Sequence, residues 1–180
     1  VLDLFGVEAD LKADVMRHGQ SLSELSARCL TAFEPLIAEA QPDVVIVQGD
    51  TTSAAMGALA GFYAGVPVWH VEAGLRTATP RLPFPEEMNR RLIGRLASVH
   101  LPPTAGPREN LVREGIDPDT IVVTGNTGID VRFAASTADL RPGGADVVWY
   151  LEWRIRPAVD LAHLGDLLGA EVELCDVGDR

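Results

Sequence analysis

Apolar and polar residues recur along this chain with two different periods, and these periods predict helices and strands in turn. Residues 21–41 carry apolar side chains at helical spacing, with Ser21 or Ser23 placed to cap the helix and Pro42 to end it. Continuous apolar runs rich in β-branched residues predict strands that are buried on both faces. Helices are expected at residues 21–41, 51–65, 85–97, 104–115 and from 127 onward, and strands at residues 43–49, 66–72, 98–103 and 119–126, with a shorter alternation at residues 10–16.

The alternation of strands and helices predicts the class of fold. Such an order builds βαβ units, so we expect an α/β protein with a Rossmann-like, doubly wound parallel sheet. The pattern starts partway through a unit, which predicts that residues 1–140 are part of a larger domain. Pro142 and two glycines then form a loop or linker, and residues 141–180 differ in composition from the preceding part.

Composition and charge narrow the range of partners. The chain has 180 residues, 47% hydrophobic and 23% charged, which is enough for one domain with a substantial core. A net charge of -11 argues against a nucleic-acid or anionic-membrane partner, because phosphate binding requires a basic face. No apolar run is long enough to cross a bilayer. Cys29 and Cys175 have no ligand-like spacing, so we expect no disulfide framework and a reducing, cytoplasmic setting.

Acidic residues stand at the ends of the first two buried strands. Asp50 follows the first strand and Glu72 ends the second, and the carboxyl ends of parallel strands open on one rim, where ligands bind. Asp50 is placed either to cap the next helix or to act as a base or hydrogen-bond acceptor, and the helix start at Thr51 is an alternative anion site. Glu72 is a poor capping residue and is rarely buried alone, so an ion pair with Arg76 or with an arginine of the next helix competes with a functional role.

Polar residues also flank the third helix and the fourth strand. Glu86 and Glu87 at the start of the helix complement its dipole, and Arg90 and Arg91 are spaced to form i,i+4 pairs with them. Asn126 follows the fourth strand, where it suits a tight turn or a helix cap.

Asp50, Glu72 and an acid at the start of the third helix are predicted to converge on one cleft. Like charges that are crowded together favour the retention of a proton, which makes proton transfer near neutral pH feasible. His70 is interpreted as a structural, half-buried histidine rather than as a catalyst. The predicted site is therefore a cluster of carboxylates at the strand ends.

Four segments of the chain are distinctive in combination: VVIVQGDTTS (44–53), VPVWHVEAGLRT (66–77), PFPEEMNRRL (83–92) and IVVTGNTGID (121–130). In this order and spacing they resemble the non-hydrolysing UDP-N-acetylglucosamine 2-epimerases, and the likeness runs from about residue 4 to residue 129. The resemblance implies two Rossmann-like domains in the arrangement called GT-B, of which this chain holds most of the amino-terminal half. It also implies homodimers that serve cell-envelope polysaccharide synthesis and need no metal, nicotinamide or other cofactor.

The resemblance implies roles for individual residues. By match to the family's motifs, Asp50, Glu72 and Glu86 are the catalytic carboxylates, while Asn89 and Arg90 orient Glu86. The family's reaction removes UDP from UDP-N-acetylglucosamine to give an enzyme-bound 2-acetamidoglucal. UDP is then added back with the opposite configuration at carbon 2, which gives UDP-N-acetylmannosamine.

Further residues match binding regions of the family. Arg76 and Asn126 are expected to bind or orient the substrate. Gln20 matches a region where some bacterial members hold a second, regulatory UDP-N-acetylglucosamine. A "GTRPE"-like loop and a "GHRREN"-like loop of the family have no counterpart here, and residues 141–180 do not match. We therefore expect that tail to be either aberrant or the start of a second domain.

These departures leave alternatives open. The first is an incomplete epimerase with little or no turnover by the isolated chain. The second is a hydrolysing epimerase or a GT-B glycosyltransferase on the same scaffold, and the third is an inactive remnant or a module that binds a nucleotide sugar. The family's first strand lies beside strand 43–49, so we also expect this strand to have an open edge that promotes association.

Overall fold

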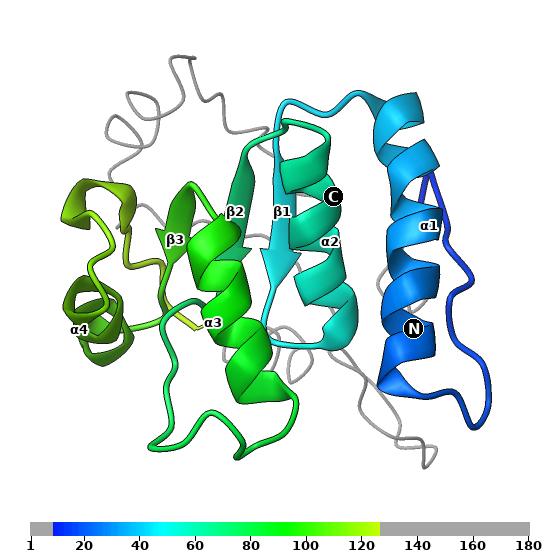
Figure 1. Ribbon diagram of the computed structural model, residues 1–180. Helices are drawn as coiled ribbons and strands as arrows, with labels where there is room; N and C mark the ends of the chain where they lie inside the picture. The colour runs from blue at the N-terminus through cyan, green and yellow to red at the C-terminus, as the bar shows by residue number, and fades with distance from the viewer. Residues whose placement is uncertain (1–8, 127–180) are drawn as a thin grey trace, which may run out of the picture.

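A computed structural model of the chain describes residues 9–126, which form a parallel sheet with helices beside it (Figure 1). The strand order is β1-β2-β3, and both neighbouring pairs are parallel, so the predicted α/β class is confirmed. Parallel neighbours need a crossover, and α2 and α3 supply it in turn. The strands are β1 (Val45–Gln48), β2 (Val68–Val71) and β3 (Val99–Leu101), and the helices are α1 (Leu22–Ala40), α2 (Thr52–Tyr63), α3 (Glu86–Leu96) and α4 (Ala105–Arg113).

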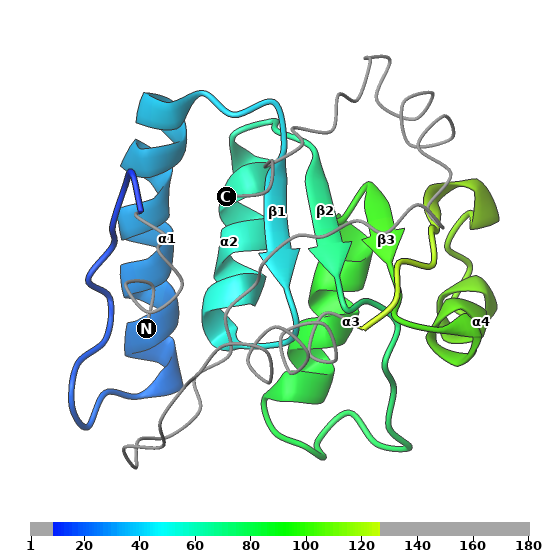
Figure 2. The ribbon, with the colours of Figure 1, turned by 180° about the vertical axis from the view of Figure 1, so that it is seen from behind.

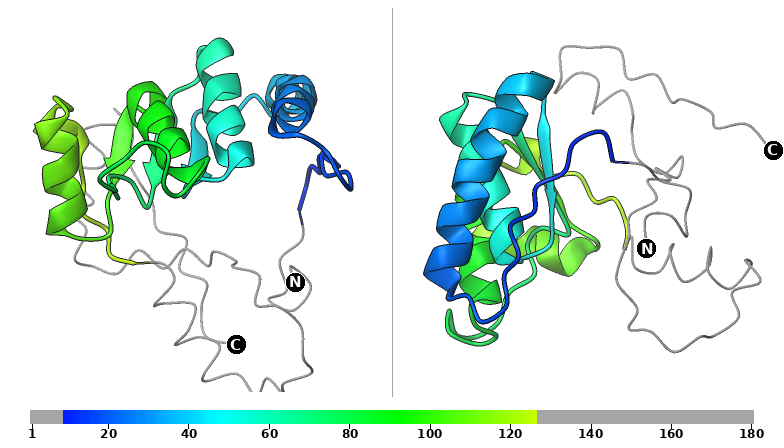
Figure 3. Two further views of the ribbon diagram at one scale, coloured as in Figure 1. Left: turned by 60° about the horizontal axis from the view of Figure 1, so that its bottom comes forward. Right: turned by 90° about the vertical axis from the view of Figure 1, so that its right-hand side faces the viewer.

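Helices α2 and α3 cover one face of the sheet, as opposite views of the molecule show (Figure 1 and Figure 2). Small residues let α2 approach closely: a Cβ on Gly61 would lie 3.0 Å from Val68 Cγ2 and 3.2 Å from Val45 Cβ. Helix α1 packs against α2 at one end of this layer, and α4 lies at the other end (Figure 3). The core between the sheet and the helices consists of Val47, Ala55, Ala58, Val68 and Ile93.

The second face of the sheet carries its own apolar cluster. Successive side chains of a strand point to opposite faces, so β2 and β3 each contribute to both layers. All residues of β2 and β3 are buried, as the continuous apolar runs predict. The second cluster consists of Trp69, Val71, Val99 and Leu101.

Strand β1 has an open edge within the described residues, where it pairs only with β2. Ile46 is 46% exposed, in contrast to the buried side chains of β2. Beside this edge, α1, β1 and α2 enclose an apolar groove of about 430 Å³ whose lining includes Phe33, Ile37, Val45 and Ile46. Among residues 9–126, no helix has the length and apolar character needed to cross a membrane.

Two predicted strands differ from the structure. The alternation at residues 10–16 is not a strand, since residues 9–20 contain no regular element. The fourth predicted strand is reduced to an isolated parallel bridge between His100 and Ile121, preceded by a short 3-10 helix (Pro118–Thr120). Pro102 and Pro103 follow β3 and have no N–H to donate, which limits the ladder on that side. The helix expected from residue 127 and the boundary at residue 140 lie outside the described residues.

Side chains cap the starts of α1 and α2, whereas α3 and α4 begin without a side-chain cap. Ser21 caps α1 in a capping box with Glu24, whose backbone N–H donates to Ser21 Oγ at 3.2 Å. Thr51, not Asp50, caps α2, because the backbone N–H of Ala54 donates to Thr51 Oγ1 at 3.1 Å. Asp50 therefore does not cap α2, which was one of the two roles that the sequence left open for it.

Candidate active site

The carboxyl ends of the strands and the starts of α2 and α3 lie on the same rim of the sheet (Figure 1). Gly49 turns the chain after β1 with a φ of 70°, and Asp50 follows it. Glu72 follows β2, and Glu86 begins α3. The fold therefore brings all three predicted carboxylates to one rim, as expected for a parallel sheet.

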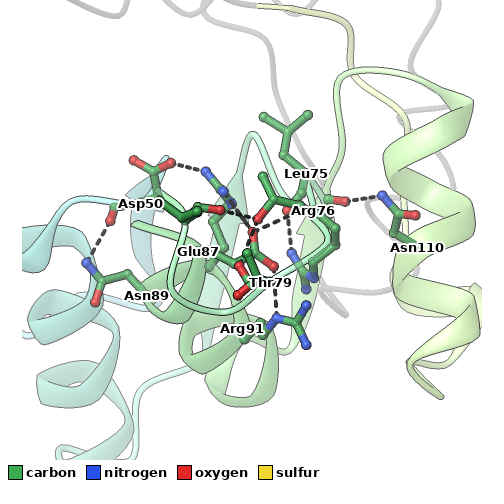
Figure 4. Close-up of polar contacts among 12 residues, drawn as sticks. Asp50, Leu75, Arg76, Thr79, Glu87, Asn89, Arg91 and Asn110 are labelled. Atoms are coloured by element: carbon green, nitrogen blue, oxygen red, sulfur yellow. Dashed lines mark hydrogen bonds and ion pairs between the residues drawn. The ribbon is translucent and has the colours of Figure 1, made fainter. Parts of the chain in front are cut away.

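Asp50 is held by two side chains of α3. Arg90 Nη1 donates to Asp50 Oδ2 in an ion pair, and the Asn89 side-chain amide donates to the backbone carbonyl of Asp50 at 2.8 Å (Figure 4). The Asp50 side chain remains 29% exposed, whereas that of Arg90 is only 8% exposed. The contacts with α3 thus fix Asp50, while part of its carboxylate remains accessible.

Glu72 occupies an unusual backbone position beside Asp50. Its φ of 63° lies in the left-handed region, which non-glycine residues seldom adopt and which stores strain. Within residues 9–126 its carboxylate has no hydrogen bond and no ion pair, and a Cβ on Gly49 would lie 3.6 Å from Glu72 Oε2. Burial, together with the charge of Asp50, raises the pKa of Glu72 against the opposing effect of Arg90.

The alternative interpretation of Glu72, an ion pair with Arg76, is wrong. Arg76 instead forms a bidentate pair with Glu114 at the end of α4, with Nε–Oε1 and Nη2–Oε2 distances of 2.7 and 2.8 Å. This pair lowers the pKa of Glu114. Arg76 therefore fastens the loop after β2 to α4, as the neighbouring contact of Asn110 with the Gly74 carbonyl also does at 2.8 Å (Figure 4).

Glu86 is partly buried at the start of α3 and makes no hydrogen bond or ion pair within the described residues. The expected contacts of Asn89 and Arg90 with Glu86 are corrected by the structure. Both side chains contact Asp50, and Arg90 also contacts Glu87. The i,i+4 pair from Glu86 to Arg90 does not form, because the guanidinium is directed to two other carboxylates.

Glu87, which was expected only to complement the helix dipole and to pair with Arg91, is a buried residue that does form this pair. Its side chain is 0% exposed and accepts hydrogen bonds from Arg90 and Arg91 and from the backbone N–H of Thr77 (Figure 4). Burial alone would raise the pKa of Glu87, but these donors outweigh it and lower the pKa. The sequence offers one indication of this buried cluster, namely two acids followed by two arginines at helical spacing. The same pattern also fits a helix start that is exposed to solvent.

Two buried histidines lie side by side beneath the rim. His70 and His100 are register partners on β2 and β3, and they are 0% and 1% exposed. His70 Nε2 lies 2.8 Å from the Gly49 carbonyl, so this nitrogen carries the proton and donates it. Burial lowers the pKa of each imidazole to about 4. His70 is therefore structural but more deeply buried than expected, and His100 was not anticipated.

The remaining predicted residues are Gln20 and Asn126. Gln20 Oε1 accepts from the backbone N–H of Arg17 at 3.1 Å and from Arg28, so it fastens the segment before α1. Asn126 is exposed at the end of the described residues. Within residues 9–126, no three His, Cys, Asp or Glu side chains are grouped so that they could hold a metal ion.

The structure is that of an α/β protein with a group of carboxylates beyond the carboxyl ends of its parallel strands. A carboxylate fixed by an arginine lies beside an unpaired carboxylate of raised pKa, and both stand beyond the strand ends. A family model described as UDP-N-acetylglucosamine 2-epimerase matches residues 1–145, so the chain belongs to this family.

Individual relatives agree with this assignment. The UDP-N-acetylglucosamine 2-epimerase of Yersinia pestis is 42% identical over 178 residues, which cover 96% of this chain and 47% of the relative. The structure of the Neisseria meningitidis UDP-GlcNAc 2-epimerase bound to UDP-GlcNAc has a TM-score of 0.73 and 41% identity, and the match covers 75% of this chain and 36% of that one. The Methanocaldococcus jannaschii UDP-GlcNAc 2-epimerase in complex with UDP-GlcNAc and UDP has a TM-score of 0.70 and 31% identity, over 77% and 38% of the two chains.

These similarities confirm the predicted family and the Rossmann-like fold of GT-B type. The chain spans less than half the length of these relatives. The expected extent of the likeness, residues 4–129, was too short, because the family match reaches residue 145. The Yersinia pestis relative aligns over 96% of the chain, so the alignment also enters the tail that was expected not to match.

Proposed function

We propose that this chain provides the carboxylate site of a UDP-N-acetylglucosamine 2-epimerase, which interconverts UDP-N-acetylglucosamine and UDP-N-acetylmannosamine. The observation that carries the proposal is the Glu72 carboxylate, which has no ion pair among residues 9–126 and lies beside the Asp50–Arg90 ion pair, on the rim where parallel sheets bind ligands. Family membership supports the substrate, since the related Neisseria meningitidis structure is bound to UDP-GlcNAc.

The proposed chemistry requires a proton to leave carbon 2 and UDP to depart. Abstraction of a weakly acidic proton needs a base whose proton affinity suits the working pH. Glu72 meets this need, because burial and the Asp50 charge raise its pKa. Asp50 is held by Arg90 as a fixed carboxylate beside it, and Glu86 is the third carboxylate of the rim. When UDP is added back to the 2-acetamidoglucal, a second carboxyl group of the site, in its protonated form, must give a proton to the opposite face of carbon 2, while the base that took the first proton keeps it.

We further propose that the protein acts in the cytoplasm, as a homodimer, on nucleotide sugars for cell-envelope polysaccharides. The family resemblance supports these points. The net charge of -11 agrees with a small-molecule substrate rather than a nucleic acid or an anionic membrane. Arg76 and Asn126 are proposed to bind or orient the substrate, the former by holding the loop after Glu72.

Binding and product analysis test the proposal separately. Calorimetric titration of the chain with UDP-N-acetylglucosamine should give saturable heat, which Glu72→Gln should leave within a few-fold in affinity. For the isolated chain we expect little or no turnover. NMR in deuterium oxide checks this expectation, because epimerisation would place deuterium at carbon 2 and give UDP-N-acetylmannosamine. Release of UDP with N-acetylmannosamine would instead identify a hydrolysing epimerase. Absence of heat at millimolar ligand would favour an inactive remnant and contradict the proposal.

A further inference from the structure

Glu87 connects the three segments that carry the candidate site. It belongs to α3, its Oε2 accepts from the backbone N–H of Thr77 in the loop after β2 at 3.2 Å, and the same oxygen accepts from Arg90 Nη2 at 2.8 Å. Arg90 in turn reaches Asp50 after β1. Because the carboxylate is fully buried and accepts several hydrogen bonds, it is held in one position.

Arg90 divides its guanidinium between two carboxylates. Nε and Nη2 donate to Glu87 at 3.2 and 2.8 Å, and Nη1 donates to Asp50. A guanidinium is planar and rigid, so holding one side of the plane fixes where the other side points. The contact with Glu87 therefore determines the direction from which Arg90 meets Asp50.

Arg91 provides the contrast within the same cluster. Its Nε donates to Glu87 Oε1 at 2.8 Å, but its side chain is 37% exposed and has no contact with Asp50 among the described residues. Arg90 and Arg91 therefore differ in reach although both are paired with the same buried carboxylate (Figure 4).

We propose that Glu87 is a positioning residue of the candidate site: it fixes Arg90, and through Arg90 it places the Asp50 carboxylate next to Glu72. This inference rests on the proposed function, since Asp50 and Glu72 matter as a pair only if the rim performs chemistry. A residue that merely complemented the helix dipole would need neither complete burial nor contact with Arg90.

The test is a pH titration of the Glu72 side-chain carboxyl by NMR in the ligand-free chain. The charged groups that act on Glu72 are Asp50 and Arg90, and Arg90 lowers its pKa. In Glu87→Gln, loss of the negative charge alone would lower the pKa of Glu72. Release of Arg90 from its place would raise it. We expect a rise; an unchanged or lowered pKa in the folded variant overturns the proposal.

Two more variants complete the experiment. Arg91→Gln removes a cation from the same carboxylate without touching Asp50, and it should change the Glu72 pKa less than Glu87→Gln does. Arg90→Lys keeps the charge but cannot contact both carboxylates with a planar fork, so it should also raise the pKa of Glu72, and it replaces Glu87→Gln if that variant does not fold. Equal effects of Arg91→Gln and Glu87→Gln, or no effect of Arg90→Lys, would overturn the proposal. The titration contains no substrate, so failure to bind UDP-N-acetylglucosamine would refute the proposed function without altering this result.

Discussion

At the scale of single residues, Glu72 combines a left-handed backbone, partial burial and an unpaired carboxylate. Each property opposes folding, because strain at such a position costs about 1–3 kcal/mol and a half-buried charge lacks compensation. The three properties occur together in one residue of the rim. This combination is expected at a site that is selected for reactivity rather than for stability.

Replacement of Glu72 by glycine is therefore expected to stabilise the chain. Glycine adopts the left-handed region without strain, so Glu72→Gly should raise the free energy of unfolding by about 1 kcal/mol. Gln41→Gly is the matched control, since Gln41 is also left-handed, with a φ of 45°, but is exposed and carries no charge. Urea denaturation should give the larger gain for Glu72→Gly; a loss of stability in this variant would contradict the account of strain.

At the scale of elements, the chain after β1 and β2 supplies Asp50 and Glu72, and α3 supplies the remaining charged groups of the site. Strands β2 and β3 supply the buried histidines beneath it. Helices α2 and α3 pack closely against the sheet, and this packing places their first turns at the rim. The positions of the carboxylates depend on it. The arrangement of the side chains at the strand ends therefore depends on the packing of these helices against the strands.

The closeness of α2 to the sheet can be tested at Gly61. Gly61→Ala places a Cβ 3.0 Å from Val68 Cγ2, and this overpacking should cost about 1–3 kcal/mol. Gly106 in α4 is the control, because a Cβ there meets nothing within 4 Å. Gly106→Ala should stabilise the chain by about 0.5–1 kcal/mol through helix propensity alone. Thermal unfolding of both variants would refute the packing argument if their effects had the same sign.

The pair of histidines on β2 and β3 predicts a loss of stability in acid. Both have a folded pKa of about 4 against an unfolded value of 6.5, so the unfolded chain binds more protons between these values. Stability is therefore complete above about pH 6.5 and falls toward pH 4, by up to about 1.4 kcal/mol per pH unit for each histidine. The raised pKa of Glu72 acts in the opposite direction and offsets a part of this loss.

Urea denaturation between pH 7 and pH 4 measures this dependence. His100→Gln should remove about half of the histidine contribution to the slope. A flat profile for the parent chain would show that the two imidazoles are not held neutral by burial.

At the scale of the whole molecule, the open edge of β1 is the feature most exposed to other chains. An unpaired strand edge next to an apolar groove is a template for pairing, and Ile46 offers apolar surface at this edge. Within the described part of the chain, no further strand pairs with the outer edge of β1.

We expect the chain to associate through this edge. Light scattering should detect species larger than a monomer, and Ile46→Lys should reduce them, since charged side chains protect edge strands. Tyr63→Lys is the control, because Tyr63 is 72% exposed but lies outside β1. A clean monomer that melts cooperatively would contradict this expectation.

The sequence predicted the alternation of elements because buried strands and capped helices have strong local signals. It located Asp50, Glu72 and Glu86 on one rim, since strand ends meet at the same edge of a parallel sheet. It did not distinguish Glu87 from Glu86, because acids at a helix start look alike until burial is known. The fourth strand was overpredicted for a similar reason: its pairing depends on a neighbour, and Pro102 and Pro103 occupy the corresponding place beyond β3.

The bidentate contact between Arg76 and Glu114 joins two positions that lie 38 residues apart in the chain. Replacement of either residue removes this contact, so we expect the two positions to change together. A mutational library that varies one of them should return the original residue under selection for stability. A library that varies both should return new matched pairs, and lineages of this family should exchange the two residues together.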